Sequence, residues 1–130
     1  MEVNPTRTIL LGDIFRKGPD PLGVWRLIQD WRLEGVFGNH DAALLQRSEI
    51  YPKPLCDWID ELPLWIDGEY QDEYGLRYWR AVHAGVNPQE MELTTRAQAI
   101  TVRRWPNDSS KSHPFWWQLY SGPRLVIYGH

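Results

Sequence analysis

The sequence has one cysteine, no long apolar run and no excess of positive charge, and each absence excludes a class of protein. Cys56 alone cannot form an internal disulfide, which is compatible with a reducing cytosol. No apolar segment approaches the roughly 20 residues that span a bilayer, and the N-terminal segment MEVNPTRTILLGD lacks the apolar stretch of a signal peptide. A net charge of −3 disfavours non-specific binding to nucleic-acid phosphates. We therefore expect a cytoplasmic protein that binds neither membranes nor nucleic acid in general.

The 130 residues suffice for one domain with a small hydrophobic core. Tryptophan is unusually frequent, with eight residues, of which Trp79, Trp105, Trp116 and Trp117 lie in the second half. Because tryptophan buries a large area, core packing is favoured over a base-stacking surface for this group.

Short apolar runs alternate with amphipathic segments, and this pattern predicts the α/β class. Strands are predicted at residues 8–11, 35–37, 64–66, 78–82 and 124–128. Helices are predicted at residues 21–33, 42–47, 55–61 and 92–104, with a further short helix after the loop 107–114. The polar, glycine-containing stretch 68–75 is predicted to be a turn.

Four of the predicted strands end in a glycine beside a polar residue that can bind metal. The four sites are Gly12-Asp13, Gly38-Asn39-His40, His83-Ala84-Gly85 and Gly129-His130. In open α/β sheets, ligands bind beyond the carboxyl ends of the strands, and glycine permits a sharp turn there. Carboxylate, amide and imidazole groups together form a donor set that suits Mn, Fe or Zn.

The segments GDIFRKGPD (12–20), GNHD (38–41), VHAG (82–85) and YGH (128–130) resemble the ordered motifs of calcineurin-like metallophosphoesterases, in the phosphoprotein-phosphatase branch. Within that branch, GPDPLGVWRLI, GNHDAALL, VHAGVNP and YSGPRLVIYGH are most similar to symmetrical bis(5'-nucleosyl)-tetraphosphatases. The similarity covers nearly the whole chain. It implies a β-sandwich flanked by helices, with two divalent metal ions between the strand ends. Mn²⁺ is favoured, and Fe, Zn and Mg are alternatives.

The resemblance also implies a role for each site residue. Asp13 corresponds to the carboxylate that bridges the two ions, while Asn39, His83 and His130 correspond to ligands of the second ion. His40 corresponds to the general acid that protonates the leaving group, not to a ligand. Two ions sharing one hydroxide lower its pKa and orient the phosphoryl oxygens for attack.

Other interpretations of these residues remain open on local grounds. Asp13 alone would suit a turn, His83 alone would suit a core, and His130 lies at a terminus, where residues are often mobile. Asn39 and Asp41 would suit the N-cap of the following helix, with Asp41 as the cap itself.

Three basic residues are candidate phosphate ligands. Lys17 stands where the family has an arginine, which keeps the charge but loses the planar fork. Arg103 and Arg104 would suit either a solvated helix end or a phosphate clamp, and Arg103 is our choice for the clamp.

The sequence departs from the family pattern in three places. No Asp-x-His motif precedes Asp13, the chain stops at His130, and Arg16 replaces the aspartate that orients the catalytic histidine. We therefore expect residues 1–130 to form a single, partial phosphoesterase domain, incomplete at both termini, that binds at most one metal ion well.

The predicted function is a metal-dependent phosphoesterase that hydrolyses a phosphate ester or phosphoanhydride. The first substrate expectation is a phosphorylated small molecule or nucleotide, such as a dinucleoside polyphosphate or capped nucleotide, and the second is a phosphoprotein. The alternative is a catalytically impaired remnant that serves as a metal-binding or interaction module.

Overall fold

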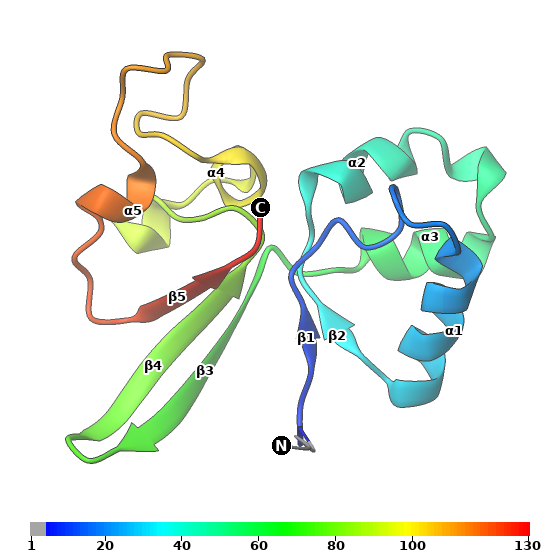
Figure 1. Ribbon diagram of the computed structural model, residues 1–130, viewed down its shortest axis with the longest axis horizontal. Helices are drawn as coiled ribbons and strands as arrows, with labels where there is room; N and C mark the ends of the chain where they lie inside the picture. Colours follow the sequence, from blue (N-terminus) through cyan, green and yellow to red (C-terminus); the bar gives the residue numbers. More distant parts are fainter. Residues whose placement is uncertain (1–4) are drawn as a thin grey trace.

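The computed structural model describes residues 5–130, which form a mixed α/β structure with two small sheets (Figure 1). The first half contains β1 (Ile9–Leu10), α1 (Pro21–Trp31), β2 (Glu34–Gly35), α2 (Asn39–Leu45), a 3-10 turn (Ser48–Ile50) and α3 (Lys53–Asp60). The second half contains β3 (Trp65–Asp72), β4 (Gly75–Val82), a 3-10 turn (Met91–Leu93), α4 (Arg96–Thr101), α5 (Trp116–Leu119) and β5 (Leu125–Tyr128). The predicted α/β class, with sheets flanked by helices, is confirmed.

The two sheets differ in topology. β1 and β2 pair in parallel, and α1, α2 and α3 lie on their side of the molecule (Figure 1). The second sheet has the order β3-β4-β5, with β3 antiparallel and β5 parallel to β4. Because parallel neighbours end at the same edge, each sheet brings two strand C-termini together.

Helix α1 begins at the predicted residue, Pro21, and ends two residues before the predicted end. The Asp20 carboxylate accepts a hydrogen bond from the Gly23 N–H at 2.8 Å, and Pro21 occupies the first turn, where its missing N–H costs nothing. The helix ends at Trp31, and Arg32 adopts a left-handed conformation with φ of 50°.

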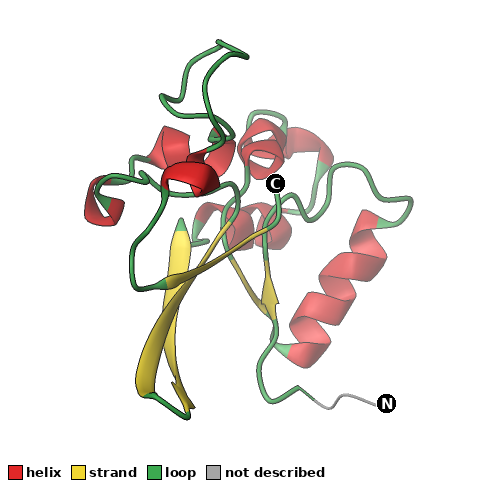
Figure 2. Ribbon diagram, turned by 60° about the vertical axis from the view of Figure 1, so that its left-hand side comes forward, coloured by secondary structure: helices red, strands yellow, loops and turns green. Residues whose placement is uncertain are grey.

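The polar stretch predicted as a turn is instead part of a long hairpin. β3 and β4 pair continuously from Trp65 opposite Val82 to Asp72 opposite Gly75. In Figures 1 and 2 the hairpin extends away from the helices, so both faces of its outer part meet solvent. Its residues can therefore be polar on both faces, and the alternation that marks a half-buried strand is absent.

The predicted helix at residues 92–104 is also wrong in extent. Thr95 begins α4: its hydroxyl accepts a hydrogen bond from the Gln98 N–H, and its own backbone N–H donates to the Gln98 side-chain oxygen. The backbone turns extended at Val102, which is buried in the core, so the helix has only six residues. Arg103 and Arg104 thus follow α4 instead of ending it, and they lie beyond its last turn.

The core interpretation of the tryptophans holds for only part of the group. Trp116 is buried and its indole N–H donates to the Ala84 carbonyl at 3.1 Å, whereas Trp117 remains 49% exposed. In the described part of the chain, no helix has both the length and the apolarity needed to cross a bilayer.

Candidate metal centre

The carboxyl ends of four strands meet between the two halves of the molecule. His83 follows β4 and His130 follows β5, and the Gly129 N–H donates to the His83 carbonyl at 2.9 Å. On the other side, β1 leads into Asp13 and β2 leads through three buried residues to Asn39. Figure 1 shows the C-terminal end of the chain lying between the two halves. The topology therefore brings all four sequence-predicted metal ligands to one place.

Three of these side chains surround one nitrogen atom of the fourth. His83 Nε2 lies 3.0 Å from Asn39 Oδ1, 3.0 Å from His130 Nδ1 and 3.3 Å from Asp13 Oδ2. Donor atoms of Asp13, His83 and His130 all lie within 4.8 Å of one another, which is close enough for a single cation to bind all three. The two histidine rings meet edge to face, with centroids 4.9 Å apart.

The backbone determines which nitrogen of His83 carries the proton. His83 Nδ1 lies 2.6 Å from the Leu11 carbonyl oxygen, which can only accept, so Nδ1 must be the donor. In the neutral ring, Nε2 is then unprotonated and directs its lone pair toward Asp13, Asn39 and His130. Histidines that bind metal through one ring nitrogen usually donate the N–H of the other ring nitrogen to a carbonyl or carboxylate oxygen. This bond also connects the two sheets.

Asp13 is held in place by an unusual backbone conformation. Gly12 has φ of 85° and Asp13 has φ of 55°, so two consecutive residues adopt left-handed conformations. The turn brings Asp13 Oδ1 within 2.8 Å of the His40 N–H at the start of α2. Non-glycine residues in this region cost free energy and cluster at functional sites. Asp13 therefore adopts a strained backbone conformation, and the surrounding contacts must offset its free-energy cost.

Asp41 supports this turn, and its role was missed in the sequence. Its buried carboxylate accepts hydrogen bonds from the backbone N–H groups of Asp13, Ile14 and Gly38, at 2.9, 3.3 and 2.8 Å. The N-cap of α2 is Gly38, so the prediction that Asp41 is the cap residue is wrong by three positions. Asp41 caps the helix from within its first turn and ties it to the loop after β1. Burial nevertheless raises the pKa of Asp41, outweighing these bonds.

His130 has the protonation that metal binding requires. Burial, followed by the charges of His83 and Arg103, holds the pKa of His130 below its usual value. The neutral imidazole, which is the form that binds metal, therefore predominates near pH 7.

His40 lies beside the cluster without joining it. Its Nδ1 is 3.6 Å from Asp13 Oδ2, and its side chain is partly exposed. The aspartate that would orient it in the family is replaced by Arg16, which is exposed. Asp13 is thus the carboxylate that faces the His40 ring.

The three predicted phosphate ligands occupy different environments. Arg103 is exposed, and its charge acts on His130. Arg104 is already engaged, because its guanidinium donates to the His113 carbonyl at 2.5 Å and lies 4.2 Å from the centre of the Phe115 ring. Lys17 lies in the exposed loop between β1 and α1.

The donor set fits one divalent cation. A carboxylate, an amide oxygen and two neutral imidazoles are the mixed ligands that suit Mn, Fe or Zn. Within residues 5–130, no second group of three His, Cys, Asp or Glu side chains comes together in this way. The ligand roles of Asp13, Asn39, His83 and His130 stay predictions, as does the identity of the metal.

The architecture supports a metallophosphoesterase-like fold. More particularly, the chain is similar to a crystal structure of a protein provisionally named a diadenosine tetraphosphatase, with a TM-score of 0.79 and 25% sequence identity. The match covers 95% of this chain but 61% of the other, so the chain spans about three fifths of that protein's length. No protein-family model and no curated protein matches the sequence. The resemblance to a metallophosphoesterase is confirmed at the level of fold, while the particular branch stays a prediction.

Proposed function

We propose that this chain is a metal-dependent phosphoesterase that hydrolyses a phosphate ester or phosphoanhydride. The observation that carries the proposal is the convergence of Asn39, His130 and Asp13 on His83 Nε2, at 3.0 to 3.3 Å. These residues come from the ends of four strands in two sheets, so their meeting is a property of the whole fold. A divalent ion held there would supply Lewis-acid stabilisation of phosphoryl oxygens and an activated water.

The protein's own residues would bind and orient the substrate around that ion. Asp13, Asn39, His83 and His130 would hold the cation. His40 acts as general acid through Nε2, because Nδ1 faces the Asp13 carboxylate. Arg103, whose charge already acts on His130, holds a phosphate oxygen by charge-assisted hydrogen bonds.

The first substrate class is a dinucleoside polyphosphate or another nucleotide, and a phosphoprotein is the second. The nucleotide is supported by the name of the similar solved structure and by the sequence resemblance. Mn²⁺ is the proposed metal, and Fe or Zn would also suit these mixed oxygen and imidazole donors.

A second candidate is a metal-binding module without turnover. It is supported by the single ligand group among residues 5–130 and by Arg16 at the position where a histidine-orienting aspartate is expected.

Hydrolysis by the 130-residue chain with Mn²⁺ tests the first candidate against the second. Turnover of p-nitrophenyl phosphate or a dinucleoside tetraphosphate is expected, and Asp13→Asn should abolish it. His40→Ala should slow turnover by about 10²–10⁴-fold, the usual contribution of a general acid. His113→Ala is the matched control, because His113 pairs with Asp108 and is not part of the cluster. Mn²⁺ binding without Asp13-dependent turnover would favour the module instead.

A further inference from the structure

A slot of about 240 Å³ opens directly beside His130. Arg103 and the aromatic rings of Phe115, Trp117 and Tyr128 line it together with His130 itself. Pockets that enclose a whole ligand usually measure about 300–1,000 Å³, so this slot suits one ring system of a ligand that extends outside it. A substrate phosphate at the candidate metal centre would therefore have an aromatic surface next to it.

The aromatic rings of the slot are exposed but held in place. Trp117 is 49% exposed and Tyr128 is 43% exposed, unlike Trp116, which also lines the slot but is buried. Phe115 and Trp117 stack in parallel, with centroids 5.4 Å apart and an angle of 7° between the planes. The Arg104 guanidinium contacts the same Phe115 ring, and Tyr128 packs edge to face on Trp116. The slot is thus preorganised before any ligand arrives, which lowers the cost of binding.

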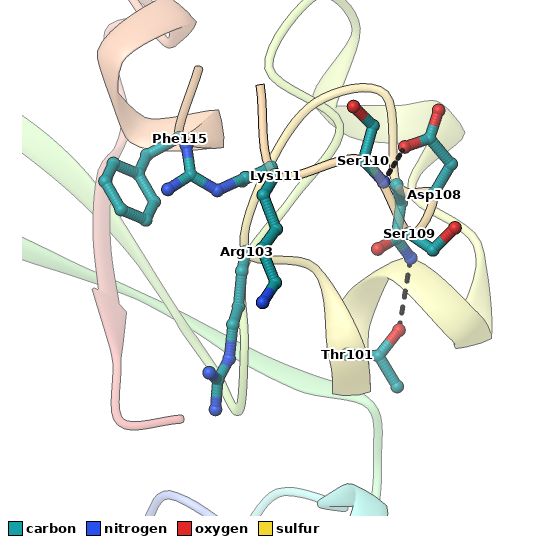
Figure 3. A pocket seen from close by; sticks show the side chains of 9 residues that line it. Thr101, Arg103, Asp108, Ser109, Ser110, Lys111 and Phe115 are labelled. Carbon is teal, nitrogen blue, oxygen red and sulfur yellow. Dashed lines mark hydrogen bonds between the residues drawn. The ribbon is translucent and has the colours of Figure 1, made fainter. Parts of the chain in front are cut away.

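Arg103 connects this slot to a second, basic hollow. The hollow measures about 470 Å³ and lies between the end of α4 and the loop that carries Ser109, Ser110 and Lys111 (Figure 3). Arg103 lines both spaces, so the residue lies between an aromatic surface and a group of hydroxyls with a further cation, and its side chain points away from the serine-bearing loop (Figure 3). An aromatic platform beside cations is the combination that binds a base together with its phosphates.

We propose that Trp117 and Tyr128 form a subsite for the nucleobase of the substrate, with Arg103 binding its phosphates. The inference rests on the proposed function and adds the residues that select a nucleotide over a phosphoprotein. Trp117 determines specificity through stacking, because its ring is half exposed and already fixed by Phe115. The base lies in the slot, and the phosphate chain runs past Arg103 toward His130.

Binding of ADP and of inorganic pyrophosphate to the full chain, measured by calorimetry in EDTA, tests the subsite without turnover. ADP should bind more tightly than pyrophosphate, because only ADP has a base. Trp117→Ala and Trp117→Leu should each weaken ADP binding by about tenfold, within the range for base stacking on one aromatic side chain. Pyrophosphate affinity should change by less than about twofold, and Trp117→Phe should retain most of the ADP affinity.

Trp31→Ala is the matched control, since Trp31 is 73% exposed on α1 and should not affect ADP binding. Equal affinities for ADP and pyrophosphate, undetectable ADP binding, or equal losses for both ligands in Trp117→Leu would overturn the subsite. Failure of the proposed function has a different signature, namely ADP selectivity without Asp13-dependent hydrolysis. Hydrolysis without any dependence of ADP affinity on residue 117 would refute the subsite alone.

Discussion

Gly12 lies where the two halves of the candidate site are in close contact. A Cβ atom at this position would lie 2.8 Å from His83 Nδ1 and 3.0 Å from the Gly38 backbone. The left-handed φ of 85° adds a second reason for glycine, because other residues are strained there. Glycine thus permits the Leu11 carbonyl to reach His83 and the Asp13 carboxylate to reach α2.

Gly12→Ala should therefore lower the free energy of unfolding by about 2–4 kcal/mol, combining left-handed strain with overpacking against backbone. Gly75→Ala is the matched control, since Gly75 also has a positive φ, of 117°, but has no atom within 4 Å of its added Cβ. It should cost about 1–2 kcal/mol from strain alone. Urea unfolding measures both variants. Equal losses would mean that the close approach at Gly12 contributes nothing.

At the scale of elements, the long β3–β4 hairpin is anchored at its base by an ion pair. The Arg80 side chain is only 3% exposed and donates to Asp67 Oδ1 at 2.7 Å and to Oδ2 at 2.9 Å. Arg80 also lies over the Trp65 ring, 4.5 Å from its centre. A buried guanidinium that lost its carboxylate would be costly, because its charge would remain desolvated.

The Asp67–Arg80 pair makes stability depend on pH. Hydrogen bonds from Arg80, with the charges of Arg80 and Arg124, hold the pKa of Asp67 below its usual value. The ionised carboxylate therefore stabilises the folded state above the unfolded pKa, and this stabilisation is lost as the pH falls through the folded pKa. Urea midpoints of the wild type should decline on acidification from about pH 5.

Asp67→Asn should reduce stability at pH 7 and flatten this decline, because the asparagine does not titrate. Arg80→Met should flatten it as well, and the double variant should lose less than the sum of the two single variants, since the pair interacts. If the urea midpoint of Asp67→Asn fell on acidification as steeply as that of the wild type, the decline would arise from other groups.

The sequence predicts the strand ends well and the intervening elements less well, for physical reasons. A glycine followed by a metal-capable residue is a local signal, so Asp13, Asn39, His83 and His130 were identifiable. The outer hairpin was missed because strands exposed on both faces lack apolar alternation. The role of Asp41 is not apparent in the sequence because two of its three N–H donors, Asp13 and Ile14, lie in a distant segment that only the tertiary fold brings to it.

At the scale of the whole molecule, the candidate site joins the two sheets. The His83–Leu11 bond and the cluster around His83 Nε2 connect residues far apart in the chain. A cation bound there would stabilise the folded chain, because the unfolded chain has no preformed site. Metal binding and the relative placement of the two sheets should therefore be coupled.

The most direct test of the metal-centre claim is calorimetric titration of the 130-residue chain with Mn²⁺. One tight site is expected, since residues 5–130 bring together a single ligand group. His83→Ala should eliminate that site, because His83 Nε2 is the atom that the other three side chains surround. His113→Ala should bind Mn²⁺ as the wild type does. Wild-type affinity in His83→Ala, or no Mn²⁺ binding by the wild type, would contradict the claim.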